Sequence, residues 1–173
     1  IYSTKPHFIE RIRSFLKQIK EVFVFLFKKG RNDFLTRFKT VLLYIKFTLK
    51  DFLLFRLLKM KIEKEKLFSY NVSFSNYSVF RTSFVEVFVL GQYDLFKIKK
   101  LGAHIIDCGA NFGMSLLFFK FSYPESKIIA FEPDPETYKI LAKNVADNRL
   151  ADVVLYNIAL SDKNGEAEFY TDE

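Results

Sequence analysis

Apolar residues recur every three or four positions through the first third of the chain, which is the period of one helix face. In residues 8–28 these positions are Phe8, Ile12, Phe15, Ile19, Phe23 and Leu26. In residues 34–60 they are Phe34, Phe38, Val41, Ile45, Leu49 and Phe52. Asp33 stands where an N-cap residue would begin the second segment. The pattern predicts two amphipathic helices, over 8–28 and 34–60.

Residues 72–88 show a different pattern. Short apolar runs flank Asn76-Tyr77-Ser78, a sequence typical of a turn. Val72, Phe74, Val79 and Phe80 are the apolar residues nearest to it. This arrangement predicts a strand-rich segment that follows the charged run Ile62-Glu63-Lys64-Glu65-Lys66.

From residue 104 onward, short apolar runs alternate with longer amphipathic stretches. The runs predict strands at 104–108, 127–132 and 152–157, separated by helices at 112–121 and 135–147. Strand–helix alternation is typical of an α/β fold with a parallel sheet. Asn164-Gly165 then predicts a hairpin turn into a returning strand at 166–170.

Each of the first two strands of this unit ends in an acid, Asp107 and Glu132. Gly109 and Gly113 follow Asp107 and allow the turn to adopt positive φ and a ligand to approach the backbone. Helix N–H groups beginning near Phe112 would point back at that ligand. A carboxylate at Glu132 can accept hydrogen bonds from both hydroxyls of a ribose. These features indicate a nucleoside-binding βαβ unit.

The nature of the nucleoside follows from what surrounds the glycines. The G-x-G-x-x-G fingerprint of NAD sites is missing, because Ala110 stands between Gly109 and Gly113. The Asp107 carboxylate would repel a pyrophosphate but attract an ammonium group. The sequence therefore favours S-adenosylmethionine (SAM) over NAD. Asp107 could also simply anchor the turn, and Asn111 could either cap the helix or contact the cofactor.

Three motifs resemble the FkbM family of class I SAM-dependent methyltransferases. They are Asp107-Cys108-Gly109-Ala110-Asn111-Phe112-Gly113, Ala130-Phe131-Glu132-Pro133-Asp134-Pro135, and Asn157-Ile158-Ala159-Leu160-Ser161-Asp162-Lys163-Asn164-Gly165. The stretch Val85-Glu86-Val87-Phe88-Val89-Leu90-Gly91-Gln92-Tyr93-Asp94 is similar to the segment that precedes the first motif in that family. The resemblance covers about residues 80–172. It implies a Rossmann-like methyltransferase fold, of which this chain holds the N-terminal part of the sheet.

The resemblance also implies a function. SAM would be bound by Asp107, Gly109, Ala110, Asn111, Gly113 and Glu132, and the reaction would be O-methylation of a hydroxyl on a sugar or another small-molecule or glycan acceptor. Cys108 stands where the family usually has an aliphatic residue. Ile158 stands where many such enzymes carry an acid, so adenine would be read there by backbone groups or apolar contact. No catalytic base can be named, although Glu86, Tyr93 or Asp94 could face the acceptor.

Charge divides the chain into two predicted regions. Residues 1–66 hold 17 Lys/Arg and 6 Asp/Glu, a net charge of +11, and residues 67–173 hold 10 and 14, a net charge of −4. We expect a basic amphipathic helical region over 1–66 and the N-terminal portion of a SAM-dependent methyltransferase domain over 67–173. The helices at 8–60 could pack on the rest of the chain or on another subunit, or lie on an anionic membrane surface.

Other features of the sequence bear on the expected binding partners and the cellular location. No nucleic-acid motif accompanies the basic residues, so no nucleic-acid partner is expected, and no Cys/His cluster indicates a metal site. Charged residues interrupt each apolar window of spanning length. A single cysteine is consistent with a reducing compartment. These features indicate a cytoplasmic protein, which could also make peripheral contact at the inner face of the membrane.

The chain begins with Ile1 rather than Met and stops soon after the third predicted strand. We therefore expect a fragment of a longer methyltransferase that is inactive by itself. The alternative is a short protein with half a fold, which would leave one sheet face bare. Such a protein would be non-catalytic and would act in membrane-surface association or assembly.

Overall fold

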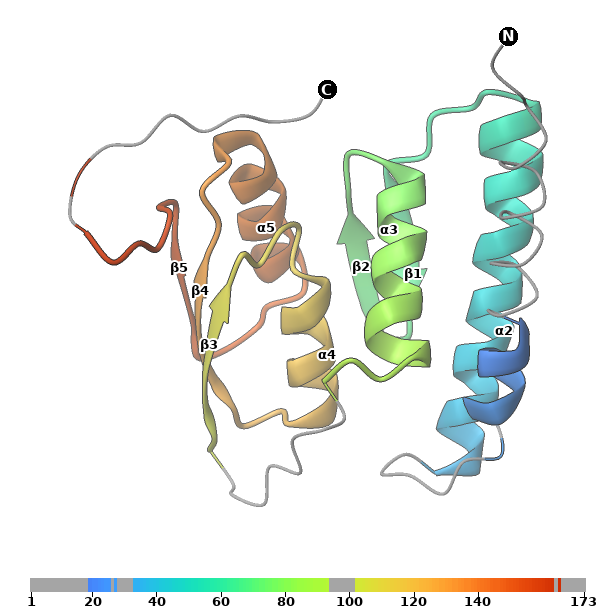
Figure 1. Ribbon diagram of the computed structural model, residues 1–173, viewed down its shortest axis with the longest axis horizontal. Helices are drawn as coiled ribbons and strands as arrows, with labels where there is room; N and C mark the ends of the chain where they lie inside the picture. Colours follow the sequence, from blue (N-terminus) through green and yellow to red (C-terminus); the bar gives the residue numbers. More distant parts are fainter. Residues whose placement is uncertain (1–18, 26, 28–32, 94–101, 164, 166–173) are drawn as a thin grey trace, which may run out of the picture.

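The computed structural model describes residues 19–25, 27, 33–93, 102–163 and 165 (Figure 1). Residues 19–25 are helical, which confirms that part of the helix predicted at 8–28. The rest of that helix, apart from residue 27, lies outside the described residues. So do Asn164, Asp94 and the strand predicted at 166–170.

The second predicted helix is confirmed, with a change of winding near its end. Helix α2 (Phe34–Lys50) continues directly into the π-helical segment η1 (Asp51–Leu57). Asp33 caps α2 as predicted, since its carboxylate accepts a hydrogen bond from the backbone nitrogen of Thr36 at 2.6 Å. Helix α2 packs inward through Tyr44 and Phe47, whereas the apolar residues on its opposite side face outward.

The prediction of a strand-rich segment over 72–88 is wrong. Strands β1 (Lys64–Leu67) and β2 (Tyr70–Ser73) form an antiparallel hairpin, but helix α3 (Tyr77–Phe84) and the π-helical segment η2 (Val85–Val89) follow it. Asn76 begins the helix instead of a turn, because its side-chain oxygen accepts hydrogen bonds from the first free N–H groups. Tyr77, Phe80 and Phe84 then bury a single face of α3.

The predicted α/β unit is confirmed almost residue for residue. Strands β3 (His104–Cys108), β4 (Lys127–Phe131) and β5 (Val153–Tyr156) form a parallel sheet in the order β3-β4-β5. Helices α4 (Met114–Ser122) and α5 (Pro135–Asp147) connect the strands and cover one face of the sheet (Figure 1). This is the first part of a Rossmann-like fold, preceded by a helical N-terminal region.

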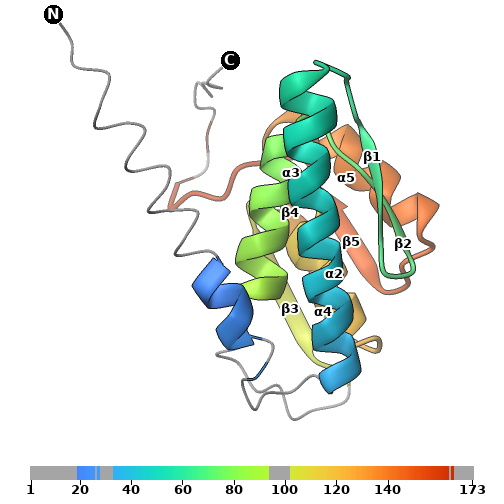
Figure 2. The ribbon, with the colours of Figure 1, turned by 90° about the vertical axis from the view of Figure 1, so that its right-hand side faces the viewer.

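An aromatic core joins the two regions of the chain. The ring of Phe47 in α2 meets the edges of Phe80 and Phe84 in α3 at 5.0 and 5.1 Å between centroids. Phe88 in η2 continues the contact to Phe118 in α4 at 5.3 Å. The layers thus run from the sheet through α4 and α5, then α3 and the hairpin, to α2 (Figures 1 and 2). Strand β1 spans the position at which the two-region division was placed, and that division stays a prediction.

Within the described residues, no helix has the length and apolar character needed to cross a bilayer.

Candidate functional site

The turn that follows β3 is fastened to the end of β4. The backbone N–H groups of Gly109 and Ala110 both donate to the carbonyl of Phe131 at 2.9 Å. Gly109, Asn111 and Gly113 all have positive φ values, of 87°, 51° and 96°, a conformation that non-glycine residues seldom adopt. The carboxyl ends of the two strands are thereby held side by side, as the sequence predicted.

Gly109 and Gly113 differ in the space that a side chain would have. A Cβ atom added at Gly113 would meet Leu141 Cδ1 of α5 at 2.8 Å, so a side chain there would displace the helix packing. A Cβ added at Gly109 would meet nothing within 4 Å. Gly113 therefore serves strand–helix packing, whereas the surface above Gly109 is open to a ligand.

Glu132 bridges the turn and the loop that follows β4. Its Oε2 accepts a hydrogen bond from the backbone nitrogen of Asn111 at 2.8 Å, and its Oε1 accepts one from the nitrogen of Asp134 at 3.0 Å. The residue is only 7% exposed. A carboxylate offers about four acceptor positions, so each oxygen retains one more for a ligand. The backbone contacts, which the sequence analysis did not foresee, fix the carboxylate at this edge of the sheet.

Asp107 points from β3 toward α4 and is 9% exposed. Its Oδ2 accepts a hydrogen bond from Ser115 Oγ at 2.6 Å. Burial raises the pKa of Asp107; the Ser115 hydrogen bond opposes this rise, and the nearby Glu132 charge adds to it. Ser115 was not predicted as a partner of Asp107; its place in the first turn of α4, just after the glycine motif, is the signal that could have found it.

Tyr93 lies beside this pair. Burial raises the pKa of its hydroxyl most, and the charges of Asp107 and Glu86 raise it further, while a hydrogen bond with Ser115 lowers it. Tyr93 also packs on Phe119 of α4, with ring centroids 5.1 Å apart. Of the three residues considered upstream of the turn, Tyr93 thus reaches the Asp107–Ser115 pair and Glu86 is exposed.

The remaining predicted residues occupy the turn itself. Helix α4 begins after Gly113, so Asn111 does not cap it; its side-chain oxygen accepts from the backbone nitrogen of Phe112 at 2.7 Å. Ala110 is buried. Asn157, just after β5, donates from Nδ2 to the carbonyls of Glu132 and Pro133 at 2.8 and 3.0 Å. The sequence did not predict a role for the Asn157 side chain. Its two hydrogen bonds fix the loop that carries Glu132.

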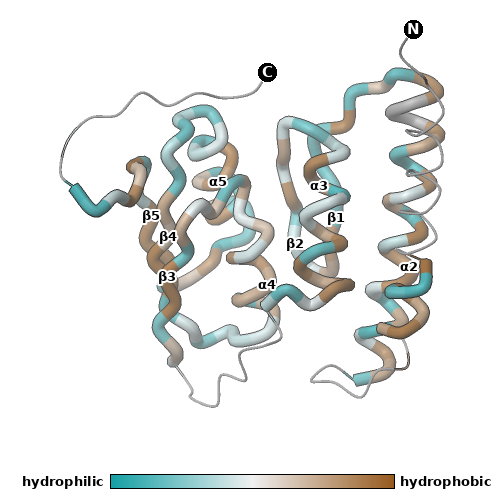
Figure 3. The backbone as a smooth tube through the Cα atoms, viewed as in Figure 1, coloured by the Kyte–Doolittle hydropathy of each residue, from teal (hydrophilic) through white to brown (hydrophobic). Residues whose placement is uncertain are grey.

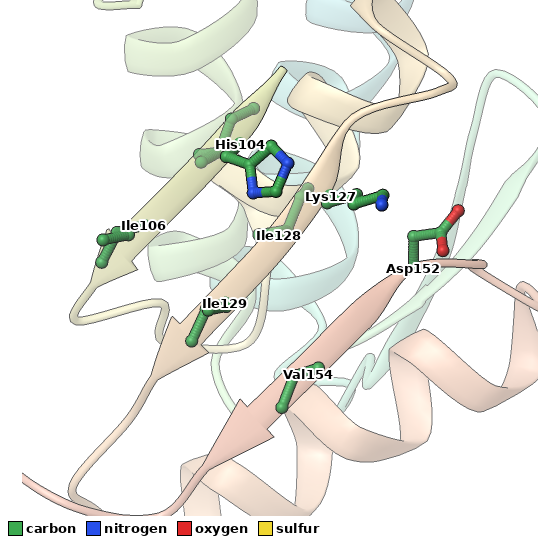
Figure 4. A pocket seen from close by; sticks show the side chains of 8 residues that line it. His104, Ile106, Lys127, Ile128, Ile129, Asp152 and Val154 are labelled. Atoms are coloured by element: carbon green, nitrogen blue, oxygen red, sulfur yellow. The ribbon is translucent and has the colours of Figure 1, made fainter. Parts of the chain in front are cut away.

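A separate pocket of about 340 Å³ lies on the sheet and does not include these residues. Ile106, Ile129 and Val154 are exposed on the sheet face opposite α4 and α5 (Figure 4). His104, Lys127 and Asp152 line the pocket near the amino ends of the strands. The pocket is therefore an open apolar sheet face, and it lies away from the carboxyl edge that carries Asp107 and Glu132.

Comparison with known proteins finds methyltransferases similar to part of the chain. Residues 107–173 match the sequence model of the methyltransferase FkbM domain. Methyltransferase sdnD of Sordaria araneosa is 41% identical over 63 residues, covering 36% of this chain and 24% of that protein. Methyltransferase 1 of Beauveria bassiana is 33% identical over 75 residues, covering 43% of this chain and 30% of that protein. The matched part of the chain thus spans less than a third of either relative.

Solved structures also resemble the chain. The crystal structure of P. horikoshii TYW2 in complex with MeSAdo aligns with a TM-score of 0.46 and 24% identity, over 60% of this chain and 38% of that one. PKMT2 from Rickettsia typhi in complex with AdoHcy aligns with a TM-score of 0.30 and 29% identity, over 34% and 11%. The sequence match is thus to the FkbM family of methyltransferases, over residues 107–173.

Proposed function

We propose that this chain forms the cofactor-binding part of a SAM-dependent methyltransferase that methylates a hydroxyl on a sugar or another small-molecule or glycan acceptor. The observation that carries the proposal is the pairing of two buried carboxylates at one edge of the sheet. Asp107 and Glu132 end neighbouring strands on either side of a turn whose Gly109 faces open space. In open α/β sheets, ligands bind at this carboxyl edge.

The residues present fit SAM in three respects. The spare acceptor positions of Glu132 suit the two hydroxyls of a ribose. The carboxylate of Asp107 suits the ammonium group of the amino-acid end. The open surface at Gly109 lets the cofactor lie against the backbone. Asn111 and Ala110 complete the same turn, and apolar contact with Ile158 or Ala159 would serve the adenine.

When bound, SAM supplies an activated methyl group on a sulfonium. The task of the protein is then to orient the acceptor oxygen, to exclude water and to accept the hydroxyl proton. Hydrogen bonds to Asn111 and Asp134 keep the Glu132 carboxylate oriented before a ligand arrives. Ser115 does the same for Asp107. The base that accepts the proton is not among the residues assigned to the site.

Both relatives are named methyltransferases. In this chain, the carboxylate of Asp107 favours a cofactor without phosphates. A pyrophosphate at the turn would lie beside Asp107, whose partner Ser115 is neutral and cannot offset that charge. Calorimetric titration of the full chain with S-adenosylhomocysteine and with NADH tests this point. Binding of the first compound alone supports the proposal, and binding of NADH alone contradicts it.

The acceptor class needs a second experiment, performed on the full-length protein. Methyl-labelled SAM is supplied with candidate sugars, glycans and other hydroxyl compounds, and the labelled product is treated with mild base. A methyl ether survives this treatment, whereas a methyl ester is hydrolysed. Base-stable label on a hydroxyl compound supports O-methylation; base-labile label, or label on nitrogen, contradicts it.

The non-catalytic alternative makes the opposite prediction. A SAM-fold protein that acts only in membrane association or assembly would show no methyl transfer to any acceptor. The cytoplasmic location also stays a prediction, which immunolocalisation in the source cells tests directly.

A further inference from the structure

Helix α2 exposes a continuous apolar stripe on the side that faces away from the sheet. We define the α2 stripe as Phe34, Phe38, Leu42, Ile45 and Leu49 of α2 together with Phe52 of η1, whose exposed fractions run from 43% to 61%. The opposite side of the helix holds Thr40, Tyr44 and Phe47, all buried. The helix is thus anchored by one side, and the stripe on its other side is exposed. Figures 2 and 3 show α2 on the side of the described fold that lies away from the sheet.

A pocket with lysines at its margin adjoins the stripe. It has a volume of about 390 Å³ and is lined by Lys39, Leu42, Leu43, Lys46, Lys66 and Phe68. Leu42 belongs both to this pocket and to the α2 stripe, so the two surfaces are continuous. Leucine, phenylalanine and lysine side chains line it, and one of these lysines, Lys46, also pairs with Glu65. Such a pocket suits a ligand with an anionic head and an apolar tail.

Acidic side chains neutralise this surface only in part. The segment 34–57 carries five basic residues and a single acid, Asp51. Asp51 is buried and lies 3.5 Å from the Arg81 guanidinium, measured from Oδ2 to Nε. Glu65 is also buried, and it accepts hydrogen bonds from Lys46 and Lys50 at 2.9 and 2.5 Å. The exposed surface around the stripe therefore remains cationic.

We propose that the α2 stripe and the adjoining lysine pocket dock the protein on an anionic phospholipid bilayer. A helix with an apolar side and flanking basic residues lies in the plane of a bilayer, with its apolar side among the acyl chains. Lys39 and Lys66 then face the anionic headgroups, which attract basic side chains near the surface. The described helices do not span a bilayer, so the contact is peripheral.

Charge decides against a second copy of the chain as the occupant. A two-fold contact through the α2 stripe would place the basic margin of one copy near the same margin of the other, and like charges repel. A bilayer with anionic lipid offers the complementary charge. This inference is independent of the proposed methyl transfer, since it involves no residue of the turn at 109–113.

The test is co-sedimentation of the full chain with vesicles of phosphatidylcholine alone and with vesicles that contain one part in three of phosphatidylglycerol. We expect binding to the anionic vesicles that weakens as salt is added. Lys39→Gln combined with Lys66→Gln should weaken the partition constant roughly 30-fold, because each basic residue near an anionic surface contributes about 1 kcal/mol. Leu42→Ser combined with Ile45→Ser should abolish binding.

Lys139→Gln combined with Lys143→Gln is the matched control. Both lysines are exposed on α5, where they pair with Glu136 and Asp147, and the change in net charge is identical. The control should bind as the unaltered protein does, and circular dichroism should show that all three variants are folded. The proposal would be overturned if the control lost as much vesicle binding as the Lys39/Lys66 variant, or if the protein bound neutral and anionic vesicles equally. It would also be overturned if light scattering showed a dimer that the Leu42/Ile45 variant abolishes.

Discussion

The Oε2 atom of Glu132 lies 2.8 Å from the backbone nitrogen of Asn111, twenty-one positions earlier in the chain. This hydrogen bond joins the two motifs that the sequence places at the ends of separate strands. It gives Glu132 a structural role in the turn in addition to the ligand role proposed for it. Experiments on this residue must therefore separate cofactor binding from stability.

Substitution of Glu132 can make that separation. Glu132→Ala leaves the backbone N–H groups of Asn111 and Asp134 without their acceptor and should cost about 1–3 kcal/mol of unfolding free energy. Glu132→Gln keeps one acceptor oxygen, so it should cost less stability. Both variants should bind S-adenosylhomocysteine at least tenfold more weakly, as calorimetric titration would show. Unchanged affinity in folded Glu132→Gln would remove the ribose role.

Asp107 should make the folded protein less stable as the pH rises. Its pKa is raised in the folded state, so the folded protein binds this proton more readily than the unfolded chain does. This group therefore favours folding at low pH and opposes it as the pH rises past the raised pKa. Asp107→Asn should raise the unfolding free energy at neutral pH and flatten its pH dependence between acidic and neutral conditions, as urea unfolding at several pH values would show.

The same Asp107→Asn variant should bind S-adenosylhomocysteine about tenfold or more weakly, because it loses the charge offered to the ammonium group. Ser115→Ala is the control: it leaves the carboxylate in place but removes the hydrogen bond that lowers the pKa of Asp107. In Ser115→Ala, carbon NMR should show Asp107 protonating at higher pH. A stability loss in Asp107→Asn combined with full affinity would favour the turn-anchor interpretation.

The two glycines of the turn should respond differently to alanine. Gly113→Ala forces a positive φ on a residue with a Cβ and drives that atom against Leu141, so it should cost about 2–4 kcal/mol of stability. Gly109→Ala meets open space and should cost only the backbone term of about 1–2 kcal/mol. Its methyl group should nevertheless weaken cofactor binding. Equal stability losses in the two variants, measured by thermal unfolding, would contradict this distinction.

Asn144 in α5 should be a strong point of attachment for the hairpin. It is 1% exposed, and its amide exchanges hydrogen bonds with both backbone groups of Ser73 and donates to the carbonyl of Phe112. Asn144→Ala leaves these buried groups unpaired and should cost about 2–4 kcal/mol in denaturant unfolding. Asn148→Ala is the matched control, because Asn148 bonds to Asn71 in a more exposed position and should cost about 1 kcal/mol.

The sequence by itself determined the features that depend on local chemistry. The period of apolar residues located α2 and the β3-α4-β4-α5-β5 unit, and Asp33 was recognisable as a cap because capping joins residues three positions apart. The acids Asp107 and Glu132 were placed at the same sheet edge because parallel strands bring their carboxyl ends together.

Only the tertiary structure decided which partners those residues take. The apolar face of residues 77–89 is buried because Phe80 and Phe84 meet Phe47 of α2, a contact between segments that are distant in the sequence. The inward side of α2 is set by the same aromatic core. The pairing of Ser115 with Asp107, and the steric demand of Leu141 on Gly113, likewise arise between segments that fold together. Local periodicity specifies an element, whereas non-local packing selects the face it buries and the groups it brings to the site.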